Sequence, residues 1–163
     1  MKVLKRKLPD IFEKVKSDVK KVLKRHRARL NLGLVKIGKP TDGFIGGLHM
    51  SPGNDIYMNE TALEHIIEGQ PKDIVRAYAY HILLHEYIHS LGILEEKKCR
   101  EITLHISKQV FKKGDPALIL AENGIGINFP NLKMIYAPPE LNPYGLSEEY
   151  IKDFDRESQT YFS

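Results

Sequence analysis

The chain of 163 residues contains a single cysteine, no tryptophan and no long hydrophobic run. The one cysteine, Cys99, excludes an internal disulfide and favours a reducing compartment such as the cytoplasm. Without an apolar stretch of about 18 residues, we expect no membrane-spanning helix, and the basic start of the chain lacks the apolar core of a secretory signal. A composition of 42% hydrophobic and 28% charged residues is instead typical of a soluble globular protein, and we expect one domain over residues 1–163.

The charge is unevenly distributed along the chain. Residues 1–39 contain 14 Lys and Arg against 3 Asp and Glu, whereas the remainder contains 11 against 18. A basic segment of this kind can bind nucleic acid or an acidic partner. Because Phe12 is the only aromatic residue in the segment that could stack on a base, we favour a solvated helix face over a nucleic-acid site.

The hydrophobic spacing predicts an α+β fold. A basic amphipathic helix is expected over about residues 10–28, starting after Pro9, because its apolar residues recur at three- and four-residue steps. Strands expected over 30–37, 44–50 and 55–59 would form a small mixed sheet of about three or four strands, packed on a long helix that carries the active site. The expected helices after them span 59–68, 71–92, 94–112, 116–122 and 147–156, followed by a loosely packed C-terminal tail.

The long helix ending near Gly92 contains the HExxH sequence HEYIH over residues 85–89. Two histidines four residues apart share one helix face with Cβ atoms about 5–6 Å apart, so His85 and His89 can bind one Zn²⁺. Glu86 lies beside them, where its carboxylate can accept a proton from a water that the metal activates. The rest of this helix is apolar on most of its surface and should be buried, and burying these three polar residues without a shared ligand would be costly. We therefore predict one zinc ion per chain.

A catalytic zinc usually has three protein ligands and one open position. Gly92 can end the helix in a left-handed conformation and return the following residues toward the histidines. Glu95 is the expected third ligand because it shares a helical stripe with Cys99 and two isoleucines that should face inward. Glu96, about a hundred degrees round the helix, is the second candidate, and more distant carboxylates are less favoured.

Three further residues have simpler interpretations. His81 lies four residues before His85 on the same face, and we expect it to support the site or to pack beside it. His49 is interpreted as an ordinary strand residue. Cys99 is interpreted as a small residue of the core.

The sequence HEYIHSLGILE over residues 85–95 resembles the HExxHxxGxxH/D signature of metzincins, a group of zincin metallopeptidases. It has Glu95 where metzincins have His or Asp; gluzincins also use a glutamate, usually further from the motif. The sequence KMIYAP over residues 133–138 is similar to a metzincin Met-turn, in which a methionine underlies the metal, and in astacin-like members a tyrosine can assist at the metal. The resemblance implies a zincin-like fold, a role for Tyr136, and an extended peptide bound along an edge strand at 44–50, where glycines would leave room for its backbone.

Together these features predict a zinc metallopeptidase that acts on a peptide or protein. His85, His89 and Glu95 would bind the metal. Glu86 would act as the general base, and Tyr136 would help to stabilise the oxyanion. One alternative is a metal-dependent endoribonuclease, since rRNA-maturation endoribonucleases have a similar H-x₃-H-x₅-ligand spacing and a basic segment would suit RNA, although those enzymes lack the glutamate after the first histidine. A non-catalytic, zinc-stabilised binding module is the other alternative, and four protein ligands would favour it.

Overall fold

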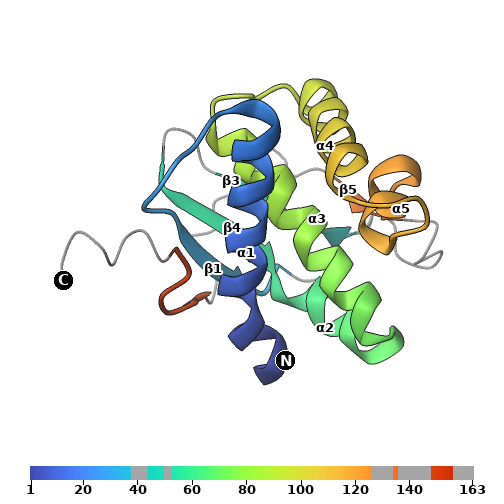
Figure 1. Ribbon diagram of the computed structural model, residues 1–163. Helices are drawn as coiled ribbons and strands as arrows, with labels where there is room; N and C mark the ends of the chain where they lie inside the picture. The colour runs from blue at the N-terminus through green and yellow to red at the C-terminus, as the bar shows by residue number, and fades with distance from the viewer. Residues whose placement is uncertain (38–43, 50–52, 126–133, 136–147, 156–163) are drawn as a thin grey trace.

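The computed structural model describes the chain except for residues 38–43, 50–52, 126–133, 136–147 and 156–163 (Figure 1). The helices among the described residues are α1 (Lys2–Leu23), α2 (Glu60–Gly69), α3 (Lys72–Ser90), α4 (Glu96–Val110) and α5 (Pro116–Asn123). The strands among them are β1 (Asn31–Val35), β2 (Phe44–Ile45), β3 (Gly47–His49), β4 (Asp55–Asn59), β5 (Met134–Ile135) and β6 (Glu148–Tyr150). This mixture of helices with a small mixed sheet confirms the predicted α+β class.

The larger sheet has the strand order β3-β4-β1-β6. β1 pairs in parallel with β4, while β3 and β6 add antiparallel strands at the two edges. β1 is buried at every residue after Asn31, because a central strand covered on both faces has no solvent side. The predicted strand over 44–50 is divided, since β2 pairs with β5 in a separate two-stranded sheet and β3 forms an edge of the larger one.

The long helix α3 lies at the centre of the fold. It packs against α1, α4 and α5 and also against strands β3 and β4, and Figure 1 shows it between α1 on one side and α4 with α5 on the other. Its apolar side chains are therefore buried on most sides, as their distribution around the helix predicts. Tyr87, directly between the motif residues, is fully buried and meets the ring of Phe12 edge-on at 5.5 Å.

The prediction for the first helix was wrong at both ends. α1 begins at Lys2 and continues through Pro9, and it ends at Leu23 because Lys24 adopts a left-handed conformation with φ of 57°. The stripe of buried side chains starts with Leu4 and Leu8, before the proline. Burial of these residues outweighs the single backbone hydrogen bond that a proline removes within a helix.

The predicted helix over 147–156 was also wrong. Residues 148–150 form strand β6, which pairs with β1. Phe154 then stacks on Phe12 with 4.1 Å between the ring centroids, so the chain is well packed as far as Asp155. The tail over 156–163 lies outside the described residues.

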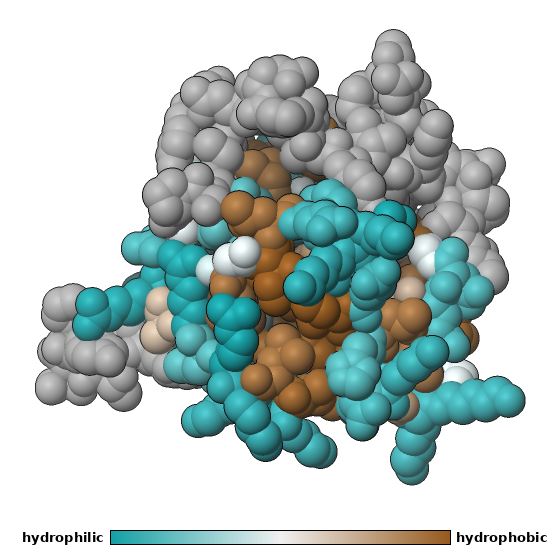
Figure 2. Space-filling model, turned by 90° about the horizontal axis from the view of Figure 1, so that it is seen from above, coloured by the Kyte–Doolittle hydropathy of each residue, from teal (hydrophilic) through white to brown (hydrophobic). Residues whose placement is uncertain are grey.

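Apolar side chains form a patch on one face of the molecule. Figure 2 shows hydrophobic residues gathered in the middle of one face with hydrophilic residues around them. Leu94, which follows α3, is one of the large hydrophobic residues that remain exposed. Within the part of the chain that the structure describes, the helices are all too short or too polar to cross a membrane.

Candidate metal centre

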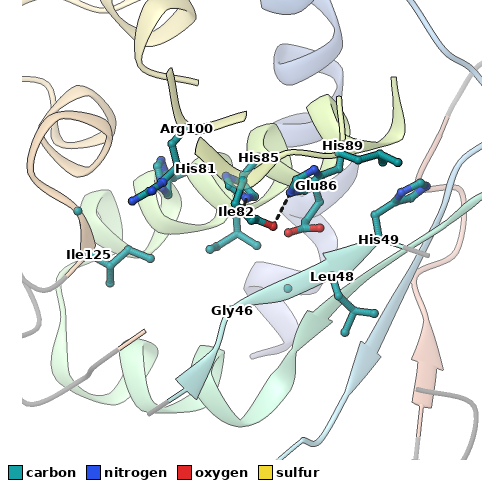
Figure 3. A pocket seen from close by; sticks show the side chains of 14 residues that line it. Gly46, Leu48, His49, His81, Ile82, His85, Glu86, His89, Arg100 and Ile125 are labelled. Atoms are coloured by element: carbon teal, nitrogen blue, oxygen red, sulfur yellow. Dashed lines mark hydrogen bonds and ion pairs between the residues drawn. The ribbon is translucent and has the colours of Figure 1, made fainter. Parts of the chain in front are cut away.

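The residues of the HExxH motif open onto a cavity of about 630 Å³ between α3, β3 and the start of α4. His85, Glu86 and His89 project from α3 toward the edge strand β3, which lies opposite them (Figure 3). Leu48 and Leu94 add apolar walls. The cavity therefore places the motif beside the backbone of an edge strand.

Glu96 connects the two histidines of the motif. Its Oε2 atom lies 3.0 Å from Nε2 of His85, and its Oε1 atom lies 2.9 Å from Nε2 of His89. The two imidazole rings stand nearly perpendicular with centroids 4.8 Å apart. One nitrogen from each ring and both oxygens of one carboxylate thus converge on the same point.

Glu95, the favoured third ligand, lies elsewhere. It is the exposed residue before α4 and has an extended backbone, with φ of −71° and ψ of 125°. The helix begins two residues later than predicted, which leaves Glu95 outside it. Its inward stripe starts at Glu96 and continues with Cys99, Thr103 and Ile106. The structure therefore brings together His85, His89 and the second candidate, Glu96.

Hydrogen bonds fix the roles of the ring nitrogens. Nδ1 of His89 lies 2.7 Å from the carbonyl oxygen of Ile93, and because a carbonyl can only accept, this nitrogen carries a proton. Burial opposes protonation of the rings, but contacts with Cys99 and Glu96 outweigh it and raise the pKa of His85 to about 10 and that of His89 to about 11. Burial likewise opposes ionisation of Glu96, but the two rings lower its pKa to about 2. Without metal, the cluster is thus a carboxylate between two imidazolium rings.

Glu86 has a different environment from Glu96. It is only 6% exposed, and its Oε2 atom is buried without a hydrogen-bond partner among the described residues. Burial raises the pKa of Glu86 to about 7, while the neighbouring histidines lower it in part. A carboxyl group with this pKa can both accept and release a proton near neutral pH.

Cys99 belongs to the same cluster. It is fully buried, as the sequence predicts, but its Sγ donates to the carbonyl oxygen of His85 at 3.3 Å. One ligand atom from each of His85, His89 and Cys99 lies within 4.8 Å of the others, so this group could hold a metal ion. Burial opposes ionisation of the thiol, but contacts with both histidines lower its pKa below the ordinary value. The interpretation as a plain core residue missed this position, which the spacing Glu96-x-x-Cys99 on one helix face could have indicated.

Two more histidines line the cavity. Burial lowers the pKa of His81 to about 4, which keeps the ring neutral beside the charged site. His49 reaches the cavity from β3, and its Nε2 donates to the carbonyl oxygen of Gly53 at 3.0 Å (Figure 3). Burial lowers the pKa of His49 as well. The sequence interpretation of His49 as an ordinary strand residue missed its place in the cavity.

The second predicted catalytic residue, Tyr136, lies outside the described residues, as does most of the segment compared with a Met-turn. Met134 is in β5, where its backbone pairs with that of Phe44.

No protein-family model matches the chain, and no curated protein or solved structure shows significant similarity to it. Its chemistry is therefore inferred from the residues of the site.

Proposed function

We propose that this protein is a zinc-dependent peptidase whose metal ion is bound by His85, His89 and Glu96. The observation that carries this proposal is the convergence of both Nε2 atoms on one carboxylate, at 3.0 and 2.9 Å. Two imidazoles and one carboxylate are a ligand set of catalytic zinc, and they leave one position open. When bound, the metal would lower the pKa of a water and polarise the scissile carbonyl group.

The surroundings of His89 support this ligand set. The carbonyl oxygen of Ile93 holds the proton of His89 on Nδ1, so that Nε2 presents its lone pair to the site once its own proton is lost. Such a hydrogen bond fixes the orientation of a ligand ring and makes the ligand more basic. Metal binding would release the extra protons of the two rings, and the positive charge of the metal ion would replace theirs.

Glu86 is suited to act as general base in this proposal. It follows His85 directly in α3, is buried, and has an oxygen atom that is unpartnered within the described part of the chain. That oxygen is available to accept a proton from an attacking water and to deliver it to the leaving amine. The raised pKa of about 7 matches this exchange near neutral pH.

The edge strand β3 supports an extended peptide as the substrate. In the described part of the chain, β3 is an edge strand of the larger sheet. Gly46, Gly47 and Leu48 line the cavity beside the HExxH motif. A peptide could add to this edge through backbone hydrogen bonds. Gly47 lacks a side chain where a Cβ atom would meet Ile82 and Glu86, so the edge strand lies close to the motif helix. This arrangement is consistent with the resemblance to zincins, which remains part of the proposal.

The basic segment offers less support for an endoribonuclease. Two of its arginines are used within the fold: Arg25 donates to the carbonyl oxygen of Leu91 at 2.6 Å, and Arg27 donates to that of Ser90. They stabilise the C-terminal end of α3, where carbonyl groups lack helical partners. Part of the basic charge is thus explained by the fold itself.

The test is cleavage of an internally quenched peptide library by the zinc-loaded protein, with wild type, Glu86→Gln and Glu95→Gln compared. Wild type and Glu95→Gln should cleave peptides, whereas Glu86→Gln should retain zinc and lose roughly 10²–10⁴-fold in turnover, the usual contribution of a general base. Equal cleavage by wild type and Glu86→Gln would contradict the mechanism. A parallel incubation with RNA tests the alternative, and RNA cleavage that requires zinc, without peptide cleavage, would support the endoribonuclease.

A further inference from the structure

Two helices face each other across the cluster, and each presents two metal-binding side chains one turn apart. α3 contributes His85 and His89, and α4 contributes Glu96 and Cys99. Residues three or four apart lie on the same face of a helix, so both pairs point at the same space. The proposed peptidase uses only three of these four groups.

Cys99 is placed to be the fourth. Its thiol contacts the carbonyl oxygen of His85 at 3.3 Å, and its sulfur lies within 4.8 Å of a ring nitrogen of each histidine. Coordination requires the thiol to turn from this carbonyl toward the rings. Thiolates bind Zn²⁺ strongly, and sets combining cysteine and histidine are common in zinc proteins.

A second, independent feature points to a ligand at this place. Glu86 is 6% exposed, and its Oε2 atom is buried without a partner among the described residues. Buried carboxylate oxygens normally have a hydrogen-bond partner, so this orphan indicates that the cavity holds a further polar species. His85 and His89 line this cavity, and the Cys99 sulfur lies within 4.8 Å of a ring nitrogen of each.

We propose that Cys99 is a fourth protein ligand of the metal, which makes the resting centre closed. This inference rests on the proposed function for the identity of the metal and of the other three ligands. Zinc sites with four protein ligands are structural, whereas catalytic sites keep one position open. A water molecule therefore has no place until the thiolate leaves, and the peptidase is latent while Cys99 is coordinated.

The decisive measurement is X-ray absorption at the zinc edge of the zinc-loaded full chain. Wild type should show one sulfur neighbour at about 2.3 Å besides nitrogen and oxygen neighbours at about 2.0–2.1 Å. Cys99→Ala and Cys99→Ser should lose the sulfur neighbour and keep about one zinc per chain, since three ligands remain. Wild type cleaves peptides only in the fraction of molecules from which the thiolate has left the metal, so both variants should also cleave peptides several-fold faster than wild type.

The outcomes separate this inference from the proposed function. A wild-type spectrum without sulfur overturns the fourth ligand and leaves the peptidase proposal standing. A sulfur neighbour in wild type, with no peptide cleavage by wild type or by either variant, supports the ligand and overturns the peptidase. Wild type that binds no zinc overturns both. Because the wild-type spectrum decides the coordination by itself, poor folding of a Cys99 variant leaves the test intact.

Discussion

His89 donates a hydrogen bond from Nδ1 to the carbonyl oxygen of Ile93, 2.7 Å away, so the turn that ends α3 also orients a residue of the motif. Gly92, with φ of 98°, allows this turn because its backbone conformation suits a residue without a Cβ atom. The same turn starts α4 and brings Glu96 to both histidines. The ring orientation and the third ligand thus depend on one short connection.

The two adjacent glutamates before Cys99 should differ sharply in their effect on metal binding. Glu96→Ala removes the carboxylate that contacts both rings, whereas Glu95→Ala removes an exposed side chain. We expect Glu96→Ala to weaken zinc binding by roughly 100-fold or more, because even hydrogen-bond partners of metal ligands contribute about 10–100-fold. Competition with a zinc-binding dye measures the affinity, and His85→Ala serves as a positive control. Loss of affinity in Glu95→Ala but not in Glu96→Ala would show that Glu95 is the ligand.

Glu86 should destabilise the metal-free protein at neutral and higher pH. The folded protein holds the Glu86 proton up to about pH 7, whereas the unfolded chain releases it near its ordinary pKa of 4.5. The contribution of Glu86 to the free energy of unfolding therefore falls as the pH rises from 4.5 to 7, by roughly 3 kcal/mol. Glu86→Gln cannot ionise, so its unfolding free energy should exceed that of wild type by about this amount at pH 8 and match it at pH 4.

Urea denaturation in the presence of a chelator measures this difference at both pH values. Glu95→Gln is the matched control, because it removes an exposed carboxylate nine residues along the chain. An equal advantage of Glu86→Gln at pH 4 and pH 8 would mean that packing, and not the ionisation of Glu86, causes the effect.

Local signals in the sequence predicted much of the fold. Asn59 and Asp115 precede helices in the sequence, and both accept a hydrogen bond from the backbone two residues later, Asn59 from Thr61 at 3.1 Å and Asp115 from Ala117 at 2.9 Å. Such caps depend on a few neighbouring residues and can therefore be predicted from the sequence. The HExxH spacing is equally local, which is why His85, Glu86 and His89 could be selected directly.

The differences between the predictions and the structure concern contacts between distant residues or a shift of one position. Strand β6 forms because the edge of β1 offers backbone partners more than a hundred residues away, which the local helical pattern of 147–156 does not reveal. The choice between Glu95 and Glu96 depends on the residue at which α4 begins, and helix ends are hard to predict to one residue. Cys99 seemed a core residue because burial alone does not show which groups surround it.

Gly47 should tolerate no side chain. A Cβ atom there would lie 2.8 Å from the carbonyl oxygen of Tyr57, 2.9 Å from Cγ2 of Ile82 and 3.3 Å from Cγ of Glu86. We expect Gly47→Ala to lower the free energy of unfolding by about 1–3 kcal/mol, as overpacking does, and to reduce peptide cleavage by displacing Glu86. Gly69→Ala, where a Cβ atom meets nothing within 4 Å, is the control and should leave both unchanged. Thermal unfolding and the peptide assay measure the two effects; a Gly47→Ala variant as stable as Gly69→Ala would mean that β3 and α3 do not pack this closely.

A buried ion pair should hold the C-terminal segment on α1. Lys16 Nζ lies 2.7 Å from Oδ1 of Asp155, with side chains 3% and 0% exposed, and Oδ2 of Asp155 accepts from the backbone nitrogen of Leu30 at 3.1 Å. Asp155→Asn leaves the Lys16 charge buried with a weaker set of partners, and removing one partner of such a pair typically costs about 3–5 kcal/mol. We expect Asp155→Asn to lower the free energy of unfolding by an amount near the lower end of this range, since Glu13 also contacts Lys16 at 3.0 Å.

Lys16→Met should recover much of the loss when combined with Asp155→Asn, because the uncompensated charge is then removed. The exposed Asp153, whose φ of 56° an asparagine tolerates, provides the control: Asp153→Asn should change the free energy of unfolding by less than about 0.5 kcal/mol. Urea denaturation of wild type and these three variants forms the comparison. If Asp155→Asn is no more destabilising than Asp153→Asn, the contact with Lys16 does not anchor the segment, and the stacking of Phe154 on Phe12 becomes the interaction that holds β6 beside β1.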